Sequence, residues 1–150
     1  MAFSKPGPNK RVCAFLIDVT IIHVIGVSIS FLLAQDVSWL VFILIVLFKD
    51  CFNGQSVGKY WVGTQVIDDN GLPAAPAKTV IRNIFMCLPV MPLIEYIVML
   101  RDKTEGKRLG DKVAKTKVND LKPQISDGTF LWISLGLVVI MILFSLQSRS

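Results

Sequence analysis

The chain has 150 residues, of which 53% are hydrophobic and 18% are charged, and its formal net charge is +5. Soluble domains carry roughly a quarter charged residues, so this composition excludes an ordinary soluble globule and is typical of a membrane protein. The Lys and Arg residues flank apolar runs and form no basic patch with interleaved aromatics, which argues against nucleic-acid binding. We expect them to set the topology and to contact anionic lipids of the bilayer.

The first apolar run, residues 12–33, is long enough to cross a bilayer, because a helix of about 20 residues spans the hydrocarbon core. It is too long for the apolar region of a signal peptide, which has about 7–15 residues, and it ends without a small-x-small cleavage site. The sequence therefore predicts a transmembrane helix here, with a charged residue, Asp18, inside it.

The second apolar run, residues 37–48, follows after a short turn. It is short for a span, but it crosses if Lys49 extends its charged end to the interface. We expect the two helices to form an antiparallel hairpin, with Trp39 near the far interface.

Residues 54–59, Gly-Gln-Ser-Val-Gly-Lys, invite comparison with a phosphate-binding loop. That loop needs four residues between its glycines and a Ser or Thr after the Lys, whereas here three residues intervene and Tyr60 follows. The comparison fails, and we expect a tight turn near the membrane with Lys59 facing lipid.

Two segments have the alternation and the β-branched residues of short strands, residues 60–71 and 114–120. The first ends in an Asn70-Gly71 turn. They predict a small cytoplasmic β-ribbon, although irregular loops remain an alternative on the sequence alone.

The third apolar run, residues 80–100, contains Arg82 and Glu95 and is broken by Pro89 and Pro92. Proline removes a backbone donor and kinks a helix. The fourth run, residues 130–146, carries no charge and predicts a plain span.

The distribution of basic residues decides between topologies. The N-terminus, the second loop and the third loop are all basic, and the third has eight Lys and Arg between residues 101 and 122. The positive-inside rule places all three in the cytoplasm. Four crossings would send the third loop outside, so residues 80–100 either re-enter the same side or form a kinked full span. The fold class is an all-α membrane protein with three to four transmembrane helices and the N-terminus in the cytoplasm.

Three residues at the start of the first run share one helix face, Arg11, Ala14 and Asp18. Ala14 is small and lets another helix approach closely. An ionised group near the bilayer centre costs at least ~2.5–3.5 kcal/mol, so Asp18 must be paired, face water or be protonated. Glu95 is the other embedded acid, and the candidate partners are the cations Arg82, Lys49 and Arg11.

The sequence contains no recognisable enzyme or metal motif. Its three cysteines, Cys13, Cys51 and Cys87, form no CxxC pair, and its one histidine, His23, lies in a predicted span. No Ser-His-Asp set can be assembled and no HExxH occurs. We expect a protein that is not an enzyme and that uses neither a cofactor nor a metal.

Four blocks together resemble the RDD family of bacterial membrane proteins: Arg11 with Ala14 and Asp18, residues 54–71, Ile81-Arg82-Asn83, and residues 107–118. The resemblance covers residues 10–119, which we take as the membrane domain; residues 120–128 would be a linker and residues 129–150 an additional transmembrane helix and tail. The arginine and two aspartates that name the family correspond to Arg11, Asp18 and Asp111.

The resemblance implies a multi-pass protein of the bacterial inner (plasma) membrane, in a family of largely unassigned function for which cation/proton antiport has been proposed. It also suggests Asp111 as a partner of Arg11 at the cytoplasmic edge, since Arg–carboxylate pairs hold geometry well. The chain departs from the commoner family pattern at residues 114–116, where Ala-Lys-Thr replaces Ala-Gly-Thr, and in its fourth apolar run.

Two functions remain open. In the first, Asp18, together with Glu95, exchanges protons and monovalent cations, while Arg11 and Asp111 brace the cytoplasmic mouth. A chain this short offers few walls for a pathway, so exchange predicts a homo-oligomer. In the second, the protein is a non-transporting membrane scaffold or accessory protein, whose embedded charges fix the packing of its helices.

Overall fold

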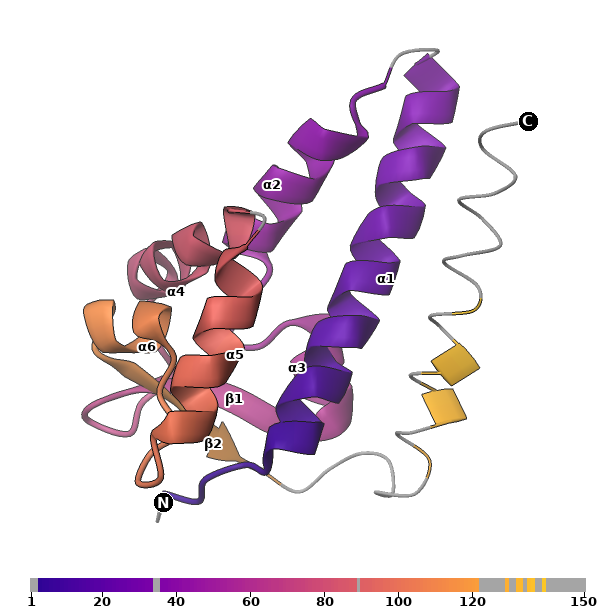
Figure 1. Ribbon diagram of the computed structural model, residues 1–150. Helices are drawn as coiled ribbons and strands as arrows, with labels where there is room; N and C mark the ends of the chain where they lie inside the picture. Colours follow the sequence, from indigo (N-terminus) through magenta and orange to yellow (C-terminus); the bar gives the residue numbers. More distant parts are fainter. Residues whose placement is uncertain are drawn as a thin grey trace.

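The computed structural model describes residues 3–33, 36–88 and 90–121, together with isolated positions 129, 132, 133, 135, 136 and 139. Most of the predicted linker and of the predicted C-terminal helix, residues 130–146, therefore lies outside the described residues. Within the described part the chain is mainly helical, with one small two-stranded ribbon at the end of the molecule opposite the α1–α2 turn (Figure 1).

The first two helices form the predicted antiparallel hairpin. They are α1 (Pro8–Leu33) and α2 (Ser38–Phe48), which lie side by side in Figure 1. Helix α1 is long and apolar enough to cross a membrane, and α2 is a shorter apolar helix. Helix α1 begins at Pro8 rather than at residue 12, because a proline is tolerated in the first helical turn. Arg11 therefore lies inside the helix, near its start.

The predicted ribbon is present. Strands β1 (Thr64–Asp68) and β2 (Thr116–Asp120) pair antiparallel, with Val66 opposite Val118, and both of these valines are buried. The first strand begins later than the sequence suggested, because residues 57–62 form a short helix, α3 (Val57–Val62). Ser56 starts this helix by accepting a hydrogen bond from the Lys59 N–H, as N-cap serines do.

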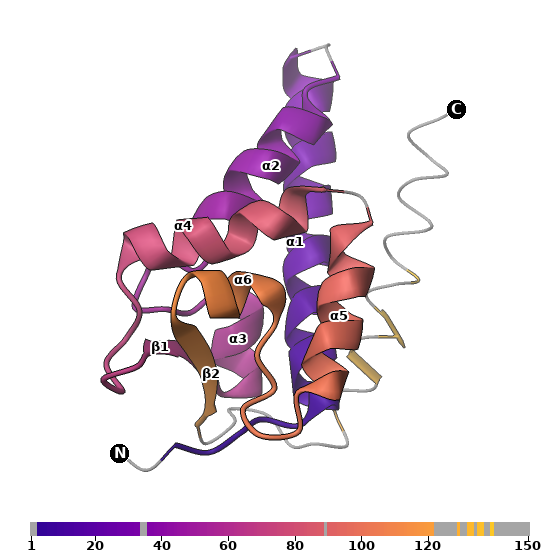
Figure 2. The same ribbon diagram turned by 60° about the vertical axis from the view of Figure 1, so that its left-hand side comes forward.

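The third apolar run is broken at the predicted prolines. Helix α4 (Pro76–Ile84) continues into the 3₁₀ turn η1 (Phe85–Cys87), and α5 (Met91–Arg101) starts after the break. The two helices are bent by 114°. Figure 2 shows α4 crossing α1 steeply, whereas α5 runs along α1. The chain therefore turns back by more than a right angle instead of continuing in one direction.

A sixth helix, α6 (Leu109–Val113), forms where the sequence suggested only a loop, and it leads directly into β2. The order α1-α2-α3-β1 is thus followed by α4-α5-α6-β2. This parallel order of elements indicates that the chain is built from two related halves.

The sequence supports this repetition. Residues 101–120 match residues 49–68 without a gap, 52 positions later (101 minus 49). The spacing of the turns and of the strand agrees throughout the block. Identical residues occupy Asp50 and Asp102, Gly54 and Gly106, Gly58 and Gly110, Thr64 and Thr116, Val66 and Val118, and Asp68 and Asp120.

Backbone geometry repeats along with the sequence. Gly54 and Gly106 both have positive φ, at 67° and 62°, and the turns before the two strands hold Gly63 at 72° and Lys115 at 52°. The strand register is symmetric about the Val66–Val118 pair, since Thr64 faces Asp120 and Asp68 faces Thr116. A pseudo-two-fold axis therefore passes through the centre of the ribbon.

The segments before α1 and α4 correspond as well, with a shift of 68 positions (76 minus 8) between Pro8 and Pro76. The Asp120 N–H donates to the Ser4 carbonyl at 2.8 Å, and the Asp68 N–H donates to the Leu72 carbonyl at 2.8 Å. We call residues 4–68 the first repeat and residues 72–120 the second repeat. The shift falls from 68 to 52 within the helical hairpins, so the second hairpin is 16 residues shorter (68 minus 52).

Candidate functional site

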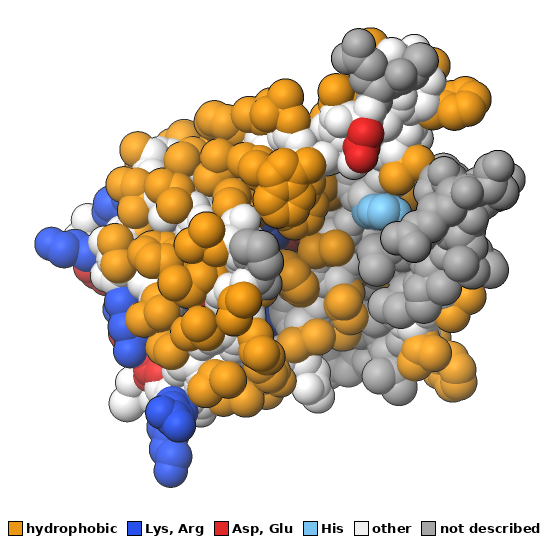
Figure 3. Space-filling view, turned by 45° about the horizontal axis from the view of Figure 1, so that its top comes forward, with side chains coloured by type: hydrophobic (Ala, Val, Ile, Leu, Met, Phe, Trp, Pro, Cys, Tyr) orange, Lys and Arg blue, Asp and Glu red, His pale blue; other side chains and the backbone are white. Residues whose placement is uncertain are grey.

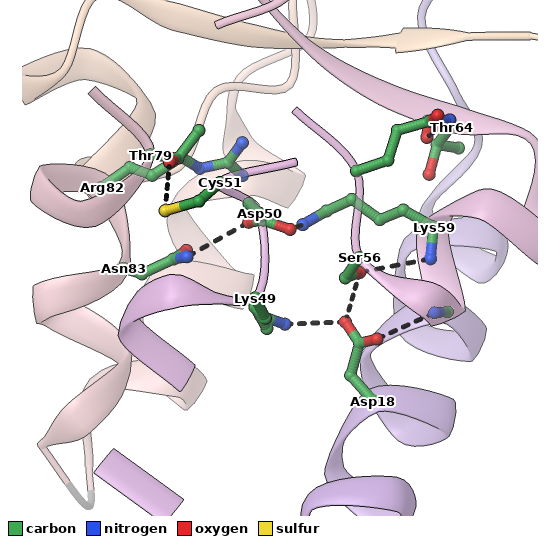
Figure 4. Close-up of polar contacts among 12 residues, drawn as sticks. Asp18, Lys49, Asp50, Cys51, Ser56, Lys59, Thr64, Thr79, Arg82 and Asn83 are labelled. Atoms are coloured by element: carbon green, nitrogen blue, oxygen red, sulfur yellow. Dashed lines mark hydrogen bonds and ion pairs between the residues drawn. The ribbon is translucent and has the colours of Figure 1, made fainter. Parts of the chain in front are cut away.

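Asp18 lies at the centre of the first repeat and is surrounded by donors (Figure 4). Its side chain is buried and accepts three hydrogen bonds: from Lys49 Nζ at 2.8 Å, from Ser56 Oγ at 2.7 Å and from the Gly58 N–H at 2.8 Å. Of the three cations that the sequence suggested as partners of the embedded acids, Lys49 is the one that pairs with Asp18. The carboxylate joins the middle of α1 to the end of α2 and to the start of α3.

Glu95 makes the equivalent contact in the second repeat, although it lies on α5, the counterpart of α2, rather than on α4, the counterpart of α1. It is buried on α5, accepts from the Gly110 N–H at 2.9 Å and forms an ion pair with Arg108 at 3.3 Å. Gly110 corresponds to Gly58, and Arg108 corresponds to Ser56. Each repeat therefore anchors its short helix to an embedded carboxylate in the same way.

Both glycines are required by close packing. A Cβ atom on Gly58 would lie 2.2 Å from the Ala14 carbonyl oxygen, and one on Gly110 would lie 2.2 Å from the Arg82 carbonyl oxygen. Helix α3 therefore packs closely against α1 at Ala14, through Gly58. At the corresponding place on α4 the second repeat carries an arginine instead of an alanine.

Lys59 and Asp50 form a second buried ion pair in the first repeat. The expectation that Lys59 faces lipid in a tight turn was wrong, because α3 directs it inward to this carboxylate. Asn83 Nδ2, from α4, donates to the other oxygen of Asp50 at 3.2 Å (Figure 4). Sequence reasoning missed Asp50, although the repeated basic-Asp pair at residues 49–50 and 101–102 was a signal for it.

Asp111 is paired with Arg82 rather than with Arg11. Arg82 Nη2 lies 3.0 Å from Asp111 Oδ1, and both side chains are fully buried. Arg11 instead donates from Nη1 to the Gly106 carbonyl at 2.6 Å. The reason is the position of the helices, since α4 packs directly on α6, while the first turn of α1 lies against the loop after α5.

Arg108 completes this cluster. Its Nε lies 3.6 Å from Asp111 Oδ2, and its backbone N–H donates to the same oxygen at 3.2 Å. Burial would raise the pKa of Asp111, but the charges of Arg82 and Arg108 outweigh it and hold the pKa below its usual value. Burial likewise opposes the charge of Arg108, but Asp111 and Glu95 outweigh it and raise the arginine pKa.

These contacts make up one charge network across both repeats. It connects all six helices of the described residues by ion pairs or hydrogen bonds, and among these residues no group of His, Cys, Asp or Glu could hold a metal ion. Its members are Asp18, Lys49, Asp50, Lys59, Arg82, Glu95, Arg108 and Asp111. Such an arrangement can fix helix packing, and it can surround a small charged ligand.

Comparison with known proteins gives one match. The model of the RDD family matches residues 5–149, which covers both repeats except for Ser4. No curated protein matches the chain, and no solved structure does.

Proposed function

The chain belongs to the RDD family, and on this premise we propose that it is a non-transporting membrane scaffold or accessory protein whose buried charges hold its helices together. The observation that carries the proposal is that both embedded acids already have a cationic partner and a backbone donor within the protein. Asp18 accepts three hydrogen bonds, one of them from a lysine, and Glu95 binds a backbone N–H and an arginine. A carboxylate that already has a cationic partner and a backbone donor has little capacity to exchange that partner for a proton or a cation.

We further propose a multi-pass topology in the bacterial inner membrane, with the N-terminus and the ribbon in the cytoplasm. The internal repetition supports it. The α4–α5 segment corresponds to the α1–α2 hairpin but is 16 residues shorter (68 minus 52), so it enters and returns where the first hairpin crosses. The 114° bend between α4 and α5 agrees with a re-entrant segment, and the basic loops then all lie on one side.

Single cysteines test the topology, after Cys13, Cys51 and Cys87 are changed to Ser. We expect Asn70→Cys, in the exposed turn between the two repeats, and Lys112→Cys, at an exposed position of the second repeat, to react with an impermeant maleimide only in everted vesicles. Asp36→Cys, at the exposed turn between α1 and α2, should react only in intact cells. If Lys112→Cys and Asn70→Cys react on opposite sides, the segment crosses the membrane and the re-entrant topology is wrong.

Proton flux in everted vesicles tests the function. We expect vesicles with the wild-type protein to show no Na⁺- or K⁺-dependent proton flux above vesicles without it. The matched variants are Asp18→Asn, in the network, and Asp36→Asn, which removes an exposed acid. Cation-dependent flux that disappears in Asp18→Asn, with the variant folded and present in normal amount, but persists in Asp36→Asn would contradict a scaffold.

One observation favours exchange as the second candidate. Asp18 and Glu95 line the same cavity, so a cation could meet both acids on one path. In that case the short chain still predicts a homo-oligomer, and the flux experiment decides between the two functions.

A further inference from the structure

A cavity of about 480 Å³ lies between the two repeats, next to the charge network. This volume is within the range of roughly 300–1,000 Å³ that small-molecule sites occupy. Part of its wall is ionisable and the rest is apolar, supplied mainly by α1 and α5 through residues such as Phe15, Leu93 and Tyr96. Figure 3 shows a hollow in the hydrophobic face, with charged side chains at its bottom.

The charges around this cavity do not balance. Five cations line it, and four carboxylates belong to the network, so one positive charge remains. The unmatched cation is Arg11, whose side chain lies within 4.0 Å of no carboxylate among the described residues and bonds only the Gly106 carbonyl. The cations are Arg11, Lys49, Lys59, Arg82 and Arg108, and the carboxylates are Asp18, Asp50, Glu95 and Asp111.

Two guanidinium groups also keep free donors. Nε and Nη2 of Arg11 are buried without a hydrogen-bond acceptor in the part of the chain that the structure describes, and so are Nε, Nη1 and Nη2 of Arg82. Arg82 is 0% exposed, and it faces Asp111 without the alignment of a hydrogen bond. Asp111 Oδ1 and Glu95 Oε2 also lack a hydrogen bond among the described residues, and Asp111 Oδ1 lies 3.0 Å from one of these five donors, Nη2 of Arg82. Buried N–H groups are nearly always satisfied, so the remaining donors of the two arginines point to an oxyanion with several acceptor oxygens.

The two repeats differ at this point in a way that supports a ligand. Where the first repeat has the small residues Ala14 and Ser56, the second has Arg82 and Arg108. Helix packing alone is achieved in the first repeat without these arginines, since Gly58 and Asp18 make the same contacts as Gly110 and Glu95. The second repeat thus pairs its two buried acids with arginines where the first uses Lys49 and Lys59, and a guanidinium group has five N–H donors where an ammonium group has three.

We propose that this cavity binds the head group of an anionic membrane phospholipid. Its phosphodiester would bind between Arg11 and Arg82, since guanidinium matches phosphate oxygens in pairs, and its single negative charge would balance Arg11. The acyl chains would leave along the apolar walls of α1 and α5. A zwitterionic head group fits less well, because its ammonium group would lie among the five cations that line the cavity and would leave the charge of Arg11 unbalanced. The inference does not depend on whether the protein exchanges ions.

The test uses the purified full-length chain in a nonionic detergent. Binding of short-chain phosphatidylglycerol is measured by calorimetry and its stoichiometry by native mass spectrometry, beside phosphatidylcholine with the same acyl chains, decanoate and inorganic phosphate. The variants are Arg11→Gln in the cavity and Arg101→Gln, an exposed arginine outside it that gives the same change of charge. Leu93→Trp narrows the apolar wall and leaves every charge in place.

We expect one phosphatidylglycerol per chain, bound at least tenfold more tightly than phosphatidylcholine, decanoate or phosphate. Arg11→Gln should weaken this binding at least tenfold and Leu93→Trp at least fivefold, whereas Arg101→Gln should stay within twofold of the wild type. Equal losses in Arg11→Gln and Arg101→Gln would mean general surface attraction and overturn the proposal. Equal affinity for decanoate would identify a carboxylate ligand, equal affinity for inorganic phosphate a free anion, and equal affinity for phosphatidylcholine a site without charge selection; each of these overturns it.

Discussion

The two repeats share one hydrogen bond, between a buried carboxylate and a glycine N–H, but their helical hairpins differ in length. We call this hydrogen bond the anchor of each repeat. In each, a carboxylate from a long helical element, Asp18 or Glu95, binds the N–H of a glycine in a short helix that leads into the ribbon. Beyond this anchor the first repeat builds a long helical hairpin, while in the second repeat the segment of α4 and α5 is shorter and the two helices are bent by 114° relative to each other. The difference teaches that the anchor and the ribbon define the common unit, and that the hairpin length can vary without changing it.

The largest expected effect comes from the two anchoring acids. Asp18→Asn leaves Lys49, whose side chain is only 9% exposed, without a carboxylate, which costs about 3–5 kcal/mol of unfolding free energy. Glu95→Gln should cost less, about 1–3 kcal/mol, because Arg108 keeps Asp111. Unfolding by SDS titration in mixed micelles measures both, with the exposed Asp36→Asn as control. If Asp18→Asn and Glu95→Gln cost the same free energy of unfolding, the remaining Asp111 carboxylate does not compensate Arg108 for the loss of Glu95.

The next effect comes from the paired glycines. Gly58→Ala and Gly110→Ala each place a Cβ atom 2.2 Å from a backbone oxygen, so each should cost about 1–3 kcal/mol. The two costs should agree within about 1 kcal/mol if the repeats are packed alike. Gly7→Ala is the control, since no atom lies within 4 Å of the added carbon. A large cost for one glycine and none for the other would break the correspondence of the repeats.

The smallest expected effect is on the stability of the protein in acid. It arises from a position where the two repeats carry opposite charges. Asp111 holds the position that Lys59 holds in the first repeat, and the charges of Arg82 and Arg108 keep its pKa low in spite of burial. A carboxyl with a lowered folded-state pKa adds stability above its unfolded pKa, about 3.9, and this stability is lost as the pH falls through the folded value. Stability should therefore fall below about pH 4.

Unfolding midpoints between pH 3 and pH 7 would measure how steeply the stability falls with pH, which we call the pH slope. Asp111→Asn should flatten it and lower stability at neutral pH, while Asp69→Asn, which removes an exposed acid, should keep the wild-type slope. An unchanged slope in Asp111→Asn would mean that other groups govern acid unfolding. Asp102 also contributes to the wild-type slope, because hydrogen bonds from its own loop outweigh its partial burial and lower its pKa to about 2.

Much of the fold could be predicted from the sequence because local signals specify it. Hydropathy gave the α1–α2 hairpin, β-branched alternation gave the ribbon, and the prolines gave the break before α5. Segment ends were less predictable: residues 60–62 look like a strand but belong to α3, because the Ser56 cap begins a helix there.

The site could be predicted only in part. Embedded charges are visible in the sequence, but their pairing depends on how the helices dock, so Arg82 rather than Arg11 reaches Asp111. The repetition was hidden because only scattered residues are identical and the shift changes within the hairpins. The departure at residues 114–116 has a structural meaning as well, since Lys115 has φ 52° where Gly63 holds the corresponding turn.

The unequal hairpins give the protein a tapered cross-section in the proposed topology. Helices α1 and α2 extend beyond α4 and α5 (Figure 1). In the proposed topology the described part of the chain would therefore displace more lipid from the inner leaflet than from the outer one. An inclusion that is wider on one side is accommodated with least bending stress where the bilayer curves to match it. In that topology the shortened second hairpin would couple the position of the protein to membrane curvature.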